Sequence, residues 1–374
     1  MVGGANKAAT IREVAALAGV APGTVSNVLT GKKLVAEPLR KAVLDAIAQL
    51  DYRPNHLASS LRFGRTKSIG IVVPDMTNPF FSGLVRELEL KAAKSGFQIL
   101  LMSSYEEAAE ERERIRALVS RQVDGLIISP SRDSIETSPH SAISGIPTVL
   151  VDRAFAVEGF DTVSADNEQA TLMGARHLIE LGHKRITFLA TAPGLANMEE
   201  RVSGYRKAMQ DAGVSDANVV YGGLSIESCR SAIEQELRRA GRPTAVFASA
   251  YVATLGAAKA IRALDLAFPQ DVSLLGFDDS DWMTVLRPYV STIEQPLDEL
   301  GHACWELLQR RMKKMDVPPS TGGSPAPCAQ GSRPAASGEN RGHARALKSE
   351  RTRKRHTCEC ATARADRSPR RTHL

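Results

Sequence analysis

The spacing of hydrophobic residues changes near residue 68. Before it, apolar residues recur three and four positions apart, the pattern of short amphipathic helices. After it, short runs of consecutive apolar residues alternate with segments of helical period. The first pattern predicts a small all-helical domain. The second predicts strands alternating with helices.

The helical part begins with a capping signal. Thr10 followed by Glu13 fits the S/T-x-x-E capping box that opens a helix, and Gly19 is placed to end it. The apolar residues of this helix fall on one face: Ile11, Val14, Ala15 and Ala18. A second helix begins at Pro22, where a missing amide hydrogen costs nothing.

The second helix is expected to present small polar residues outward while Val25, Val28 and Leu29 face inward. The outward residues are Gly23, Thr24, Ser26 and Asn27. A third helix, about 38–50, would complete the core with Leu39, Val43, Leu44, Ile47 and Leu50. Two short helices across a tight turn are typical of the helix-turn-helix, whose short polar side chains reach base edges and phosphates.

The next segment, DYRPNHLASSLRFGRTKSIGIVVPD, makes a family resemblance specific. Together with the headpiece it resembles the lactose-repressor (LacI/GalR) family of bacterial transcription regulators over residues 10–321. The resemblance implies a hinge at 55–63 that becomes helical on operator DNA, with Leu61 wedged into the minor groove. Ala58 and Leu61 share one helical face, which suits two hinges packing at a dimer axis. The predicted DNA-binding residues are Thr10, Pro22, Gly23, Thr24, Ser26, Asn27, Asn55, Ala58 and Leu61.

The body, 67–321, has strands that are apolar throughout, such as 69–73 and 186–190, which favours parallel sheets covered on both faces in a doubly wound fold. The expected strands are 69–73, 98–102, 125–129, 148–151, 186–190, 219–221, 245–248 and 272–277, and the expected helices are 80–95, 107–121, near 135–144, 169–181, 201–212, 226–240 and 253–263. The length suggests two lobes, the first ending near residue 151. The resemblance implies an α/β, two-lobed body of the type I periplasmic-binding-protein fold.

Ligands of such folds bind beyond the carboxyl ends of the strands. Aromatic faces and polar groups at these ends suit a sugar ring with its hydroxyl rim. The resemblance implies that Arg201 and Asp278 contact a small effector. The full predicted set is Phe80, Phe81, Asp152, Asn197, Arg201, Phe247, Asp278 and Trp282. One departure stands out: the family usually has Asn-Asp where this chain has Ala250-Tyr251, which removes one polar contact with the effector.

The net charge of +6 is unevenly distributed. Residues 1–68 hold ten Lys and Arg against four Asp and Glu, whereas 69–321 hold 26 against 34. A basic headpiece on an acidic body is the asymmetry expected when one end meets phosphates. Five cysteines form no disulfide framework, no apolar run approaches the roughly 20 residues of a membrane span, and the start has no apolar signal core. These features predict a cytoplasmic protein.

Composition changes again at Gly322. Residues 322–374 contain no Val, Ile, Phe, Met, Trp or Tyr, and hold twelve Lys and Arg against four Asp and Glu. We expect a disordered basic tail, because so little apolar surface cannot offset the entropy of ordering. Two interpretations stay open: a polybasic arm that holds DNA nonspecifically, or sequence out of its reading frame from near Thr321. The predicted domains are therefore 8–54, 55–66, 67–321 and 322–374.

The predicted function is a bacterial transcription regulator, a repressor, that binds palindromic operator DNA as a homodimer, joins the nucleoid when bound, and responds to a sugar-like effector. The alternative is a solute-binding protein with the same body fold. An enzyme using a nucleotide would need a glycine-rich loop after the first strand, and PDMTNPFF has none. We expect no catalytic residues, metal or cofactor.

Overall fold

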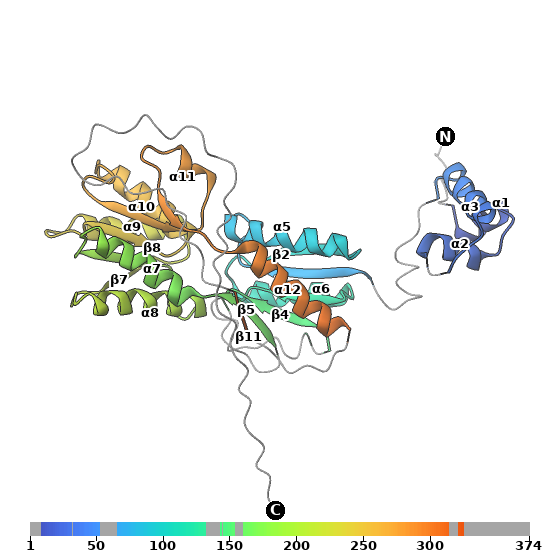
Figure 1. Cartoon of the computed structure of the whole chain (residues 1–374), viewed down its shortest axis with the longest axis horizontal. Coiled ribbons are helices and arrows are strands. Elements are labelled where there is room, and N and C mark those ends of the chain that lie inside the picture. The colour runs from blue at the N-terminus through green and yellow to red at the C-terminus, as the bar shows by residue number, and fades with distance from the viewer. Residues whose placement is uncertain are drawn as a thin grey trace, which may run out of the picture. The chain divides into compact units, whose positions relative to one another are not determined.

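The computed structural model describes residues 9–31, 33–52, 66–131, 143, 145–153, 160–313 and 321–324. They form a small helical headpiece and an α/β body with two sheets (Figure 1). The predicted hinge residues Asn55, Ala58 and Leu61 lie outside the described residues, as do 325–374 and nearly all of the helix expected near 135–144.

The headpiece has the three predicted helices, α1 (Ile11–Leu17), α2 (Pro22–Thr30) and α3 (Glu37–Gln49). The capping box is confirmed: the Glu13 amide donates to Thr10 Oγ1 at 3.4 Å, and the Thr10 amide donates to Glu13 Oε2 at 2.6 Å. Gly19 follows α1 with φ of +65°, a conformation that glycine adopts without strain.

The headpiece core is smaller than predicted. Its buried residues are Val14, Ala15, Val25, Val43 and Ala46. The expectation that Leu29, Leu39 and Leu44 face inward is wrong, since these side chains are 37%, 45% and 47% exposed. Three helices of seven, nine and thirteen residues enclose too little volume to cover every leucine at helical spacing.

The body contains two all-parallel sheets, as predicted. The first has the order β11-β5-β4-β3-β1-β2 and the second β10-β9-β8-β6-β7. The strands of the first are β1 (Ser68–Val73), β2 (Gln98–Ser103), β3 (Gly125–Ile128), β4 (Thr148–Val151), β5 (Asp161–Ala165) and β11 (Thr321–Ser324). The strands of the second are β6 (Ile186–Ala190), β7 (Asn218–Tyr221), β8 (Ala245–Ala248), β9 (Ser273–Phe277) and β10 (Ser291–Ile293).

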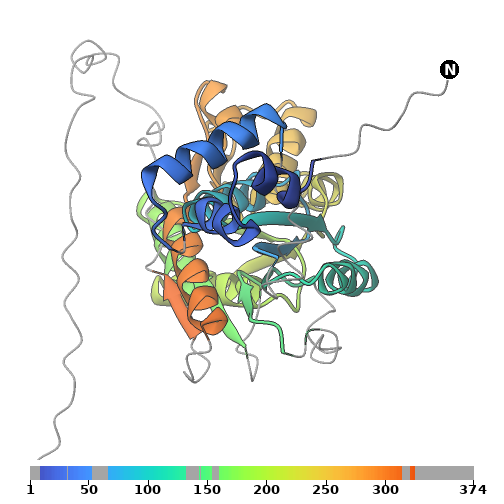
Figure 2. The ribbon, with the colours of Figure 1, turned by 90° about the vertical axis from the view of Figure 1, so that its right-hand side faces the viewer.

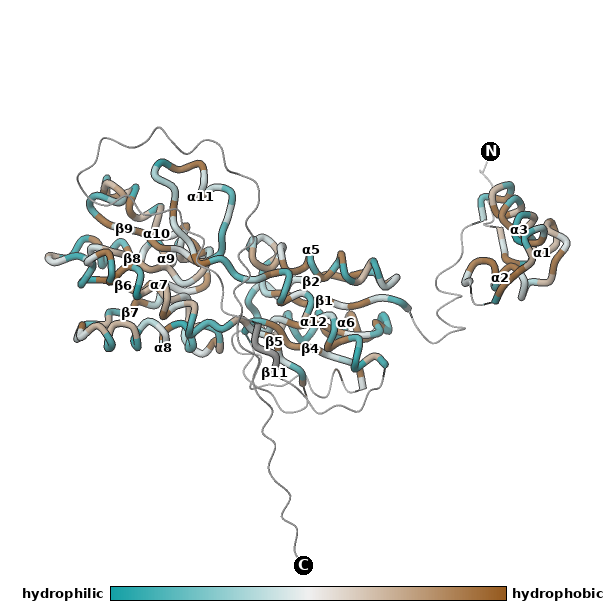
Figure 3. The backbone as a smooth tube through the Cα atoms, viewed as in Figure 1, coloured by the Kyte–Doolittle hydropathy of each residue, from teal (hydrophilic) through white to brown (hydrophobic). Residues whose placement is uncertain are grey.

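Helices cover both faces of each sheet. In the first lobe these are α5 (Pro79–Lys94), α6 (Ala108–Ser120) and α12 (Leu297–Met312). In the second they are α7 (Asn167–Glu180), α8 (Ala196–Asp211), α9 (Ile226–Leu237), α10 (Tyr251–Ala263) and the short α11 (Asp281–Val285). Helices α5 and α12 share one core with the first sheet and α6 forms another, so that α6 and α12 lie on opposite sides of it (Figure 2). Hydrophobic segments accordingly gather in the interior of the body (Figure 3).

The division of the chain between the lobes differs from the prediction. The first lobe does not end near residue 151, because β5, α12 and β11 also belong to it. The helix α12 was not predicted and neither were β5, β10 and α11. Within the described residues, the chain passes between the sheets at Asp166 and again at 294–296, and both connections are short.

Strand β11 also shifts the start of the tail. Thr321 to Ser324 pair in parallel with Thr162 to Ala165 of β5, which places three residues of the predicted tail in the first sheet. The body therefore extends at least to Ser324.

A close approach between α7 and α8 positions the second lobe's polar residues. A Cβ atom at Gly204 would lie 2.1 Å from the Glu168 carbonyl oxygen, so only glycine allows these helices to pack as they do. This contact holds α8 against α7, and α8 carries Asn197 and Arg201.

Candidate functional site

A cavity lies between the two lobes at the carboxyl ends of their strands, as predicted. We name it the inner cavity; its volume is about 60 Å³. The first lobe contributes Asp75, Asn78, Phe80, Phe81, Glu106, Asp152 and Arg153. The second lobe contributes Thr191, Leu195, Asn197, Met198, Arg201, Leu224, Ala250, Val252 and Asp278, and the connection between the lobes contributes Gln295.

A larger space of about 410 Å³ adjoins it, and we name it the outer cavity. It shares Phe80, Asp278 and Gln295 with the inner cavity. Its other lining residues are Pro79, Asp279, Glu294, Pro296, Leu297, Asp298 and Glu299. The two together reach the range of roughly 300–1,000 Å³ that small-molecule sites occupy.

Asp152 and Asn197 join the lobes across the inner cavity. The Asn197 amide donates to both carboxylate oxygens of Asp152 at 3.1 Å. Burial raises the pKa of Asp152, while Arg201, Arg153 and the hydrogen bond from Asn197 act to lower it. The Asn197 Oδ1 atom is buried and has no partner among the described residues.

Arg201 is the most deeply buried charged side chain of the cavity, with 2% of its surface exposed. Its Nε donates to Asn167 Oδ1 at 2.9 Å and its Nη1 to the Ser249 carbonyl at 2.5 Å. Burial lowers the pKa of Arg201, and Asp278, Asp152 and Glu200 oppose that shift; an arginine stays protonated under these conditions. Its Nη2 is buried without a partner in the described part of the chain.

Asp278 holds the second lobe's loops together. Its Oδ2 accepts the Tyr251 amide at 3.1 Å, and its Oδ1 accepts Gln295 Nε2 at 2.6 Å. Ala250 is the N-cap residue of α10 and has no side chain that can accept a hydrogen bond. Asp278, which is distant in the sequence, provides the capping carboxylate instead. The Gln295 Oε1 atom, also buried, has no partner among the described residues.

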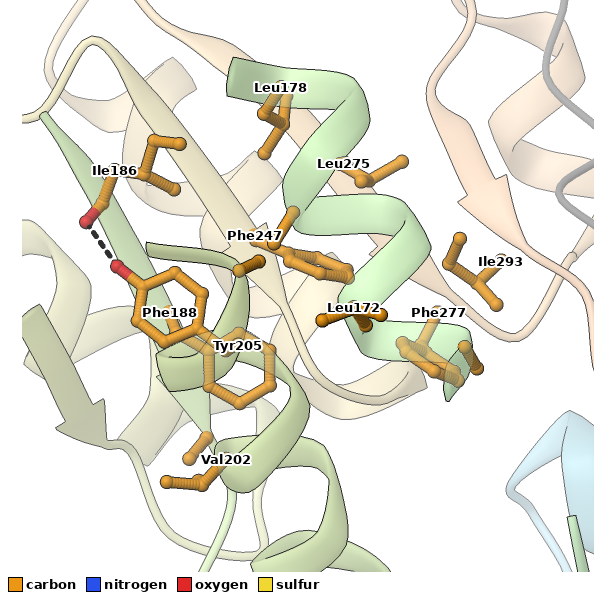
Figure 4. Packing of buried hydrophobic residues seen from close by; sticks show 14 of the residues in the cluster. Leu172, Leu178, Ile186, Phe188, Val202, Tyr205, Phe247, Leu275, Phe277 and Ile293 are labelled. Carbon is orange, nitrogen blue, oxygen red and sulfur yellow. Dashed lines mark hydrogen bonds between the residues drawn. The ribbon is translucent and has the colours of Figure 1, made fainter. Parts of the chain in front are cut away.

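Phe247 does not line either cavity, contrary to the prediction. It belongs to a row of packed aromatic rings behind the site (Figure 4). Its ring meets Phe188 edge-on at 5.2 Å and stacks on Phe277 at 6.2 Å, and Phe188 stacks on Tyr205 at 5.1 Å. The Arg201 guanidinium lies 4.0 Å from the Phe277 ring centroid, so this row supports the arginine from behind.

Trp282 does not line either cavity. It is half-buried and packs against the core that includes residues of α9 and α10, so its contact with an effector stays a prediction. Of the eight predicted effector residues, the structure brings six together: Phe80, Phe81, Asp152, Asn197, Arg201 and Asp278.

Several lining residues were not predicted. Glu106 accepts a hydrogen bond from Arg153 Nη1 at 2.6 Å. The other unpredicted lining residues are Thr191, Leu195, Leu224, Val252 and Gln295. Glu106 has a φ of +63°, and Gly223, next to Leu224 in the other lobe, has a φ of +86°. The sequence does not reveal that a glutamate adopts this left-handed conformation. The only sequence signal for these lining residues was their position shortly after a strand.

On the headpiece, α2 presents Pro22 and Gly23 exposed, with Thr24, Ser26 and Asn27 half-buried. Thr10 lies in the capping box at the exposed start of α1. These residues are therefore available for contacts with a partner, and their role in DNA binding stays a prediction.

The comparisons with known proteins agree with this geometry. Residues 66–322 match the model of periplasmic binding proteins and the sugar-binding domain of the LacI family, and residues 10–55 match the LacI family of bacterial regulatory proteins. The transcriptional repressor PurR of Photobacterium profundum is 31% identical over 310 residues, 82% of this chain and 92% of the relative.

Two solved structures show the same fold. One is a complex of the transcriptional regulator CelR with cellobiose, with a TM-score of 0.63 and 31% identity over 85% of this chain and 97% of that one. The other is the Lac repressor dimer bound to operator and the anti-inducer ONPF, with a TM-score of 0.75 and 25% identity at the same coverage. The chain belongs to the LacI family of DNA-binding transcription regulators. Its relatives are transcription regulators rather than enzymes.

No helix within the described ranges is long and apolar enough to cross a membrane.

Proposed function

We propose that this chain represses transcription as a homodimer on a palindromic operator, and that a sugar-like effector in the cavities between the lobes sets its operator affinity. The observation that carries the proposal is a set of three buried polar atoms around the inner cavity. Arg201 Nη2, Asn197 Oδ1 and Gln295 Oε1 have no hydrogen-bond partner in the described residues.

Unpartnered buried polar groups are costly, so a native site presents them where a ligand or water completes their hydrogen bonds. The three residues that carry these atoms, one donor and two acceptors, line the same cavity. A hydroxyl group can pair with the donor or with either acceptor, because it both donates and accepts hydrogen bonds. A molecule with several hydroxyl groups therefore fits the set better than an apolar ligand or one with acceptors alone.

Both connections between the lobes touch this site. Asn167, the first residue of α7, follows the crossing at Asp166 and accepts the Arg201 Nε. Gln295 lies in the crossing at 294–296 and donates to Asp278. An effector bound to Arg201 and Gln295 would act on both crossings, and so would favour one arrangement of the lobes over another. In the dimer, that arrangement sets the spacing of the two predicted hinges on the operator.

The experiment is selection of bound duplexes from a random DNA pool, repeated with a panel of neutral sugars that includes cellobiose. We expect one enriched palindrome whose binding changes with one class of sugar. Failure to enrich a palindrome would contradict the DNA-binding part, whereas an enriched palindrome with no response to any sugar would contradict the effector part.

A further inference from the structure

The two cavities are markedly acidic. Eight carboxylates and two guanidinium groups line them, with no lysine or histidine among the described lining residues. The carboxylates are those of Asp75, Glu106, Asp152, Asp278, Asp279, Glu294, Asp298 and Glu299. The guanidinium groups are those of Arg153 and Arg201.

Neither arginine is left with excess positive charge. Arg153 pairs with Glu106 at 2.6 Å and lies 3.9 Å from Asp152. Arg201 is surrounded by Asp278, Asp152 and Glu200, each of which stabilises its charged form. An anionic ligand that reached Arg201 would have to compete with these carboxylates at short range, in a buried site where charges are screened weakly.

The outer cavity, which shares three lining residues with the inner one, adds further negative charge. Asp279, Glu294 and Glu299 all line this cavity, and the pKa of Glu294 is raised by burial and then by the charges of the other two carboxylates. Asp298 is the exception, because Lys91 Nζ lies 2.5 Å from its Oδ1 and also 3.7 Å from Glu87. Lys94 and His302 also act to lower the pKa of Asp298.

We infer that Asp279, Glu294 and Glu299 form an electrostatic filter at the entrance, which admits neutral polyhydroxylated effectors and rejects anionic ones such as sugar acids and sugar phosphates, an inference that rests on the proposed function. The buried Arg201, Asn197 and Gln295 require hydrogen-bonding groups on the ligand. The three carboxylates of the filter exclude a ligand with negative charge. A neutral sugar meets both conditions, whereas a phosphorylated sugar meets only the first.

The filter can be tested without knowing the effector. Pro296 lines the outer cavity and is half-buried, so the Pro296→Cys variant places a thiol beside the three carboxylates. Cys328, Cys358 and Cys360 are replaced by serine, and the buried Cys229 and Cys304 remain. The rates of reaction with a trimethylammonium and a sulfonate methanethiosulfonate reagent are then compared with those of free cysteine.

We expect the ratio of cationic to anionic rates to exceed that of free cysteine by about tenfold or more at low salt, since clefts lined by one sign of charge enrich the opposite ion by such factors. Adding Asp279→Asn and Glu294→Gln should bring the ratio most of the way back to the free value. The matched control is Glu180→Gln on α7, an exposed carboxylate that lines neither cavity, and it should leave the ratio unchanged. A ratio equal to that of free cysteine, or one that survives both substitutions, would overturn the filter.

Paired ligands separate this inference from the proposed function. Thermal shifts are measured with each neutral sugar and its acid or phosphate, such as glucose, gluconate and glucose 6-phosphate. Stabilisation by neutral sugars alone supports the filter, and stabilisation by an anionic member above its neutral partner overturns it. If no member stabilises the chain while the thiol ratio is high, the filter stands and the sugar effector of the proposed function fails.

Discussion

Asp152 and Asp278 occupy equivalent positions in the two lobes. Each directly follows a strand, β4 or β9, that holds the same place in its sheet. Each has a positive φ, +69° for Asp152 and +64° for Asp278. Each donates its amide to the neighbouring strand, at the carbonyl of Val163 or Ile293. The cleft therefore receives one carboxylate from each lobe by the same backbone device, and residues held in this region of φ cluster at functional sites.

Replacing Arg201 should weaken effector binding. Arg201→Ala removes the donor at the inner cavity and leaves its partners unmatched, so we expect a loss of about 2–3 kcal/mol in effector binding. Operator affinity without effector should change little. Calorimetry with the identified sugar is the measurement, and Arg176→Ala, which breaks an exposed pair with Asp211, is the control. Wild-type affinity in Arg201→Ala would contradict the assignment.

Replacing Asp278 should also lower stability. Asp278→Ala leaves the Tyr251 amide and Gln295 Nε2 without their acceptor in a buried place, which costs about 2–4 kcal/mol of unfolding free energy. Asp279→Ala, one residue later and exposed, should cost far less. Urea unfolding of both variants makes the comparison. Equal losses would show that Asp278 does not act as the cap of α10.

His183 gives the body a pH dependence of known sign. Burial lowers the pKa of His183 below its ordinary 6.5, so between the two pKa values the unfolded state binds more protons than the folded one. The unfolding free energy should therefore fall as the pH falls through 6.5. In His183→Gln, which can still bond to Thr244 Oγ1, this part of the fall should vanish. Urea titrations at about pH 7.5 and about pH 5.5 measure it, and an unchanged pH dependence in the variant would exclude His183 as its source.

Leu61 should matter for specific DNA binding alone. We predict that its apolar side chain wedges into the minor groove and bends the operator, so that the cost of unstacking is offset by the contacts of the bent duplex. Leu61→Ala should weaken operator binding and leave nonspecific binding, which is mostly counterion release, nearly intact. Fluorescence anisotropy on operator and random duplexes would measure both. Equal losses on the two would refute the wedge.

The basic tail should be dispensable for operator recognition. We propose that residues 325–374 are out of frame, so truncation after Ser324 should leave operator affinity, its salt dependence and the effector response unchanged. If the tail were a working basic arm, truncation would instead flatten the dependence of log affinity on log salt by about 0.9 for each phosphate that the arm neutralises. Salt titrations of both proteins on one operator decide between them. A second truncation before Thr321 should lower the melting temperature, because it removes β11, one of the two strands that pair with β5.

Local signals in the sequence determined the headpiece helices and most strands of the body. A capping box and a proline at a helix start act within a few residues, and a buried parallel strand must be apolar on both faces wherever it lies. The same logic placed the segments that contain Asp152, Arg201 and Asp278 at the cleft, because the carboxyl ends of parallel strands meet at one edge. The family resemblance, not periodicity, singled out these three residues within their segments.

Tertiary structure decided what depends on distant partners. Phe247 lies near the carboxyl end of β8 and Trp282 lies four residues after Asp278, yet Phe247 packs in the core among other rings and Trp282 packs, half-buried, against another core cluster. Gln295 reached the site only because α12 returns to the first lobe and carries the crossing at 294–296 past Asp278. The acidity of the outer cavity also depends on residues that are distant in the sequence. Asp279 comes from the end of β9, while Glu294 and Glu299 come from the crossing and from α12, and only folding places their like charges together.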